Sequence, residues 1–176
     1  MAKLEFRLVV VEDRKEVLSD LLSCELLSTI ANYYPDKASS ERFFKYASLH
    51  PSAEVRQQVA YKDKIDEDSC RVLIEDNSAA VLKNLLRNSV FREIATLEII
   101  EKIMKRDPEL AVAVAQDVEA FKAVDIQNLA DVIASNSDPF VVLALAQNRR
   151  APKKVLRDLS MHEDPLISES ARENLK

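Results

Sequence analysis

The sequence predicts an all-α protein built from repeated pairs of helices. Its 176 residues include no glycine, although average usage of about 7% would give roughly twelve. Phosphate-binding loops and nucleophile elbows need glycine for positive φ angles or close backbone approach, and most β-hairpin turns prefer it. Aromatic residues are only 6%, tryptophan is absent, and short apolar segments recur at helical spacing. These observations favour helices over a large antiparallel sheet and exclude the glycine-dependent nucleotide sites.

A short phrase, Asp-Pro followed two residues later by an apolar residue, marks the expected helix starts. It begins at Asp107, Asp138 and Asp164, and looser versions precede Val55 and Val81. Aspartate before proline is held in the extended backbone that suits an N-cap, and proline at the first helical position loses no hydrogen bond. Each phrase therefore predicts a short helix of about two to three turns.

The apolar residue that follows each phrase is called the anchor of its repeat. Another apolar residue follows each anchor four positions later, and the anchors are separated by 26, 29, 31 and 26 residues. Apolar stripes between the anchors, such as the one over residues 126–133, predict a second helix in each unit. Helix pairs that cannot bury their stripes alone stack into a solenoid, the alternative being a non-repetitive helical bundle. The anchors are Val55, Val81, Leu110, Val141 and Ile167.

Two segments resemble the HEAT-like and leucine-rich repeat variant families. Residues 48–60 read SLHPSAEVRQQVA, and residues 146–159 read AQNRRAPKKVLRDL. The resemblance covers residues 47–176 and implies a right-handed α-superhelix of about five two-helix repeats, usually with a binding surface and with no reaction. The chain departs from the family pattern after the anchor, where only the first copy carries the arginine, Arg56. It also has no counterpart of the iron–sulfur cysteines of some variant-repeat proteins.

The first 46 residues lack the repeat and are expected to form a helical N-terminal cap, continuous with the repeat region over 47–176. Residues 4–11 fit a strand and a helix equally well, and the all-α context favours the helix. The apolar stripe from Leu18 to Ile30 predicts a helix that ends before Pro35. Ser39 or Ser40 can then cap another helix.

Few residues of this chain carry chemistry. The two cysteines, Cys24 and Cys70, lie in apolar stripes and are expected to be core residues of a protein from a reducing compartment. With only two histidines, His50 and His162, we expect no metal site, no cofactor and no enzyme activity, and His50 is expected to cap a helix. The acidic run over 63–76 predicts a helix start rather than a calcium loop. The longest apolar run has seven residues, which together with the charged N-terminus predicts a cytoplasmic protein.

The function expected from these features is protein binding on the concave face of the solenoid. A second contact is expected at a basic edge within residues 139–157, which contain five bases and no acid. This edge could instead bind a nucleic-acid backbone, although the net charge of -5 disfavours that, and a small inhibitor or immunity-type protein for one enzyme is a further alternative. The candidate residues on the anchor helices are Arg56, Gln57, Lys83, Asn84 and Arg87. Those of the basic edge are Arg149, Arg150, Lys153, Lys154 and Arg157.

Overall fold

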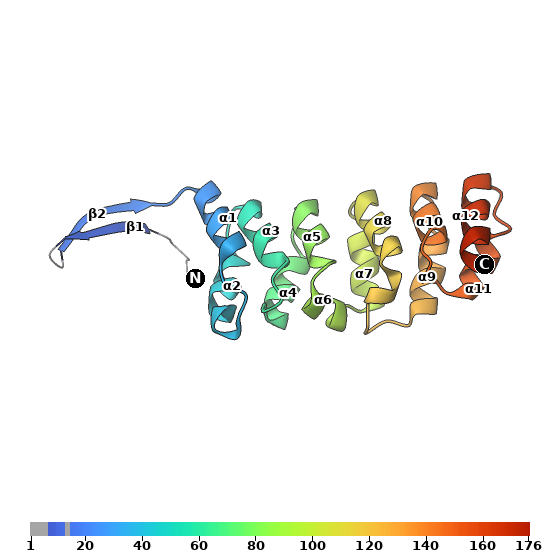
Figure 1. Ribbon diagram of the computed structural model, residues 1–176, viewed down its shortest axis with the longest axis horizontal. Coiled ribbons are helices and arrows are strands. Elements are labelled where there is room, and N and C mark those ends of the chain that lie inside the picture. Colours follow the sequence, from blue (N-terminus) through green and yellow to red (C-terminus); the bar gives the residue numbers. More distant parts are fainter. Residues whose placement is uncertain (1–6, 13–14) are drawn as a thin grey trace. The chain divides into compact units, whose positions relative to one another are not determined.

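The protein is mainly helical, as predicted. A computed structural model describes the backbone of residues 7–12 and 15–176, and side chains from residue 22 onward. Along the described chain, two strands are followed by twelve α-helices and two short 3-10 helices (Figure 1). The chain divides into two compact units, Met1–Val90 and Phe91–Lys176.

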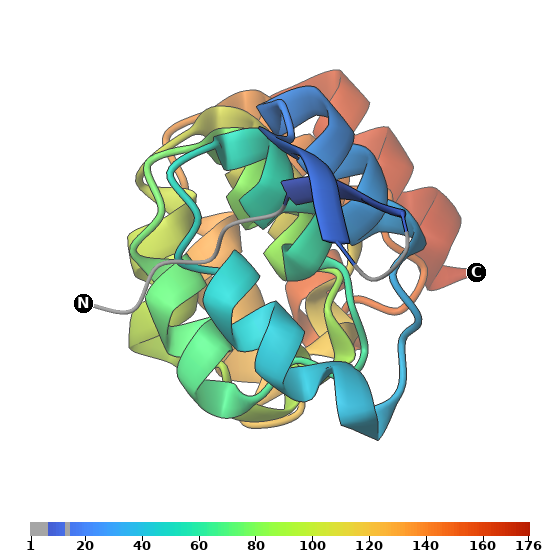
Figure 2. The ribbon, with the colours of Figure 1, turned by 90° about the vertical axis from the view of Figure 1, so that its left-hand side faces the viewer.

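An antiparallel β-hairpin forms in the N-terminal region where the sequence analysis favoured a helix. Strand β1 (Arg7–Glu12) pairs with β2 (Lys15–Leu21), drawn in dark blue in Figures 1 and 2. The register shifts by one residue between Val10 and Val11, as in a β-bulge. The helix favoured over residues 4–11 is therefore wrong where the structure describes it, and the helix predicted from Leu18 begins only at Cys24. Valine-rich segments form strands once two of them pair. Residues 1–6 and 13–14 of the predicted cap lie outside the described residues.

In the first unit, one row of helices consists of α1, α3 and α5. Helix α3 contacts both α1 and α5, and α2 and α4 lie beside this row, with α2 contacting α3 and α4 (Figure 1). A last short helix, α6 (Ser89–Ile94), crosses the boundary between the units. The bounds are α1 Cys24–Tyr33, η1 Ala38–Ser40, α2 Glu41–Ala47, α3 Ala53–Ala60, α4 Glu67–Ile74 and α5 Ala79–Leu85.

The second unit repeats this arrangement. Helix α10 contacts both α8 and α12, while α7, α9 and α11 contact α8, α10 and α12 respectively. The predicted alternation of anchor helices with second helices is therefore present in both units, and each anchor helix packs on the second helix that precedes it. The bounds are α7 Leu97–Met104, α8 Pro108–Gln116, η2 Val118–Ala120, α9 Ile126–Ala134, α10 Pro139–Ala146, α11 Lys153–Leu159 and α12 Pro165–Leu175.

Anchor helices begin where the phrases predict. Helices α8, α10 and α12 start at the proline of an Asp-Pro pair, and the carboxylate of the preceding aspartate accepts a first-turn N–H at 2.8–2.9 Å. All five anchors, and the residues four positions after them, are buried. Apolar residues four apart thus supply the core of each repeat, as expected from their common helix face.

Helix α1 has the features of a further anchor helix. Ser23 caps its N-terminus, and the buried pair Leu27 and Ala31 has the same spacing of four as the anchors. Helix α1 also packs on α3, as α3 packs on α5. The stretch expected to cap the repeats therefore contains one more helix of the anchor row.

After four of the five anchors, a polar side chain seven residues further on ties neighbouring anchor helices together. It donates to backbone carbonyls at the C-terminal end of the preceding anchor helix or in the residues directly after that helix. Such carbonyls have no hydrogen-bond partner within the helix. Lys62 Nζ reaches the carbonyls of Asn32 (2.6 Å) and Tyr34 (3.1 Å). The remaining bridges are Asn88 to Ala60 and Lys62, Asn148 to Ala115 and Gln116, and Asn174 to Ala146.

Candidate functional site

Four of the five turns before the anchor helices are built in one way, and the turn before α8, which has Lys105 at the key position, differs. The side chain five residues before the anchor accepts the backbone N–H two positions further on, at 2.9–3.1 Å. Both histidines hold this position, so their ring nitrogens Nδ1 are used within the fold. The structural role expected for His50 is therefore present, although its ring serves the turn and not a helix C-terminus. The four acceptors are His50, Asp76, Asn136 and His162.

Burial lowers the pKa of His50 below its ordinary value, and the nearby Arg56 charge acts in the same direction. The N–H of Ser52 lies 3.1 Å from Nδ1 of His50, a contact that requires this nitrogen to be unprotonated. The neutral ring is thus the form that the folded turn holds.

We expect the stability of the protein to decrease as the pH falls below about 7, and His50 to contribute to that decrease. A lowered pKa in the folded state means that the contribution is complete above the ordinary value near 6.5 and is lost as the pH falls towards the folded value. His50→Asn keeps an acceptor that does not titrate, as Asn136 does naturally. Urea denaturation between pH 7 and 5 should show a smaller loss for this variant. An unchanged pH dependence would contradict the assignment.

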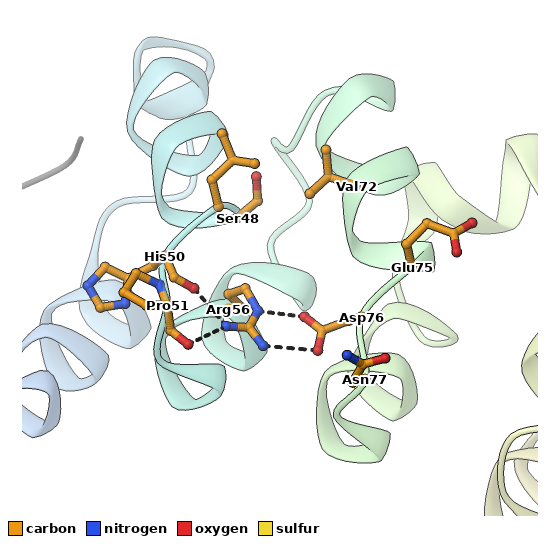
Figure 3. A pocket seen from close by; sticks show the side chains of 9 residues that line it. Ser48, His50, Pro51, Arg56, Val72, Glu75, Asp76 and Asn77 are labelled. Atoms are coloured by element: carbon orange, nitrogen blue, oxygen red, sulfur yellow. Dashed lines mark hydrogen bonds and ion pairs between the residues drawn. The ribbon is translucent and has the colours of Figure 1, made fainter. Parts of the chain in front are cut away.

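Arg56 is held between two consecutive turns of the first unit (Figure 3). Its Nε and one terminal nitrogen donate to the carboxylate of Asp76 at 2.6 and 3.0 Å. Its other terminal nitrogen donates to the carbonyls of His50 and Pro51, both at 2.7 Å. Four of its five N–H donors are therefore used inside the fold, so this predicted binding residue primarily joins two repeats.

A pocket of about 300 Å³ lies against this arginine, between the C-terminal ends of α2 and α4 (Figure 3). Two exposed apolar side chains contribute to its wall, Leu49 (59% exposed) and Val72 (42%). The pocket therefore combines an apolar wall with a polar border. Its remaining lining residues are Ser48, His50, Pro51, Arg56, Glu75, Asp76 and Asn77.

A pocket of about 200 Å³ occupies the same place in the repeats of the second unit, between the ends of α7 and α9. Val132 stands nine residues before its anchor, as Val72 does, and Met104 stands six before its anchor, as Leu49 does. A pocket at this place in the repeat is thus present in both units. Its lining residues are Glu101, Met104, Lys105, Val132, Ser135 and Asn136.

None of the other candidates on the anchor helices lines these pockets. The amide nitrogen of Asn84 donates to the carbonyl of Gln57 at 2.9 Å, which joins α5 to α3. Lys83 is half-buried and Arg87 is exposed. The sequence analysis missed the pocket residues because it looked for apolar residues within the buried stripes. Leu49 and Val72 are apolar residues outside these stripes, and this is the one signal in the sequence that could have identified them.

The basic edge is partly used by the fold. Arg150 pairs with Glu119 at 3.1 Å, and Lys153 donates to the carbonyl of Asn174. All five side chains are exposed. Of the five bases, Arg150 is the one paired here with an acid, because the bond from Lys153 goes to a neutral carbonyl and leaves its charge in place.

The cysteines differ in their surroundings. Cys70 is buried, as predicted, and burial raises the pKa of its thiol to about 12. Cys24 is exposed, so its predicted core position is wrong: it is the first residue of α1, and the buried face of that helix begins at Leu27. In the acidic run, Asp66 accepts the N–H of Ser69 at 2.7 Å and caps α4, which confirms the predicted helix start.

Within the described part of the chain, no three metal-ligating side chains come together. No helix there is both long and apolar enough to cross a bilayer. Comparisons with protein-family models, curated proteins and solved structures gave no significant match.

Proposed function

We propose that the protein is a non-enzymatic protein-binding module whose helix pairs form a right-handed α-solenoid. The recurrence of one pocket at the same repeat position in both units is the observation that carries this proposal. The side chains that join successive anchor helices support it, since they hold the surface in one conformation before a partner arrives. A preformed surface loses little conformational entropy on binding.

The pocketed face is the proposed contact surface. Leu49 and Val72 supply exposed apolar area, and polar groups border them, which is the usual composition of a protein interface. The basic edge is a second proposed contact through Arg149, Lys154 and Arg157. Pairing of Arg150 with Glu119 weakens the nucleic-acid alternative, because it leaves a smaller basic footprint.

Affinity capture with the full chain from a nuclease-treated lysate tests the proposal. We compare the wild type with Leu49→Asp/Val72→Asp, and Tyr33→Ser changes an exposed residue outside the pocket as a matched control. A protein retained by the wild type and the control but lost from the pocket variant is the expected result. Recovery of nucleic acid alone, abolished by Arg149→Glu/Lys154→Glu/Arg157→Glu, would replace the proposal with the nucleic-acid alternative.

A further inference from the structure

Exposed apolar side chains form a strip across the anchor helices of the second unit. Phe140 (71% exposed) and Leu166 (64% exposed) each stand one residue before the anchor, on helices α10 and α12 that contact each other. Leu143 lies three residues after Phe140 and so shares its helix face. Val112 holds the position of Leu143 on the adjacent helix α8, and both are half-buried. These four residues are called the apolar strip.

The helical repeat does not require this strip. The residue before the anchor is Glu54 on α3, Ala80 on α5 and Glu109 on α8, so charged and small side chains fit the same position. Two residues after the anchor, α3 and α5 carry Gln57 and Lys83. Single exposed apolar residues are ordinary on protein surfaces, whereas several on neighbouring helices indicate a binding surface.

The border of the strip is acidic. Segments 107–116, 138–146 and 163–171, which contain the strip, hold six acidic residues and no lysine or arginine. The next base along α12, Arg172, donates its guanidinium N–H groups to the carbonyl of Ser160. Three of the acids are N-cap aspartates whose charge is offset by the positive helix end, and the three glutamates are exposed. The nearest bases before α8, Lys105 and Arg106, lie in the turn that precedes it. The six acids are Asp107, Glu109, Asp138, Glu163, Asp164 and Glu169.

We propose that the apolar strip binds an amphipathic helix of a partner protein that carries lysine or arginine beside its apolar face. Burial of the strip provides the affinity, and the carboxylates orient the basic helix and accelerate its association. The same charges repel anionic partners such as nucleic acid or an acidic membrane surface. The inference rests on the proposed protein-binding role but uses a surface separate from the pockets. Variants of Leu49 and Val72 therefore test that role independently.

A labelled synthetic peptide with leucine and lysine at helical spacing is the probe, and fluorescence anisotropy with the full chain is the measurement. Saturable binding is expected, weakened at least about tenfold by Phe140→Ser/Leu166→Ser. Leu26→Ser is the matched control, since Leu26 stands just before the buried Leu27 of α1 and is 52% exposed. This control should bind as the wild type does. Glu163→Lys/Glu169→Lys should weaken binding of the lysine peptide and strengthen binding of a leucine–glutamate peptide of the same pattern.

Three outcomes would overturn the inference: no binding, unchanged binding by the Phe140→Ser/Leu166→Ser variant, or equal binding of the glutamate peptide. Circular dichroism of each variant establishes that it is folded. Sedimentation of the unliganded chain identifies a competing occupant, because a dimer abolished by the same double substitution would assign the strip to a second copy. If the strip variants bind normally while the pocket variants lose their captured partner, this inference fails and the protein-binding role stands.

Discussion

Replacement of Arg56 by alanine is expected to lower the free energy of unfolding by about 3 kcal/mol. The substitution leaves the carboxylate of Asp76, whose side chain is only 4% exposed, without the guanidinium that pairs with it. It also removes the donors to the carbonyls of His50 and Pro51. Because both turns of this contact belong to the first unit, urea denaturation followed by circular dichroism should show that unit unfolding at lower denaturant.

A double-mutant cycle separates the ion pair from general packing. Asp76→Asn keeps the acceptor for the N–H of Ser78, so Arg56→Met combined with Asp76→Asn should lose less stability than the two single changes together. Arg92→Ala is the matched control: its partner Asp117 is half exposed, so this pair is expected to contribute at most about 1 kcal/mol. Additive effects in the cycle, or an equally large effect of Arg92→Ala, would refute the explanation.

Asn88→Ala is expected to destabilise the first unit by about 2 kcal/mol. Asn88 is 1% exposed, and its amide donates to the carbonyls of Ala60 and Lys62 at 3.1 and 2.8 Å. Alanine removes the donor to both carbonyls, and because Asn88 is buried, water does not readily take the place of its amide. The same denaturation measurement reports the loss.

Two further variants show whether the bridge itself is responsible. Asn88→Asp preserves shape but removes the donors and introduces a buried charge, so it should destabilise the protein more than alanine does. Asn148→Ala makes the equivalent change in the second unit at a half-buried position, and a smaller loss is expected there. A loss from Asn88→Ala no larger than that of an ordinary surface substitution would show that the bridge contributes little.

The hairpin shows where pattern alone was insufficient. Residues 4–11 fit both a strand and a helix by their apolar spacing, and the composition of the whole chain favoured the helix. In the structure, Arg7–Glu12 forms a strand because it pairs with Lys15–Leu21. Backbone hydrogen bonds of a strand come from a second segment, so no property of the first segment reports them.

The candidate surfaces were only partly predictable for the same reason. Arg56 was predicted as a binding residue, but its partner Asp76 lies twenty residues away, in the turn before the next anchor helix. Of the two apolar side chains in the pocket wall, Leu49 lies in the turn after α2 and Val72 lies in α4. The residue pattern of a single helix predicts neither that Leu49 and Val72 lie close together nor that Arg56 is paired within the fold.

The sequence by itself determined the helix starts and the buried face of each anchor helix. Both depend on residues within one or two turns: the aspartate that caps Pro108, Pro139 or Pro165, and apolar side chains four apart. Tertiary structure alone decided which polar groups hold the repeats together and which apolar groups remain exposed. Bridges such as Asn88 to Ala60 span 28 residues, and exposure of Phe140 depends on what its neighbours leave uncovered. Such contacts are set by the packing of helices on one another, which local spacing does not encode.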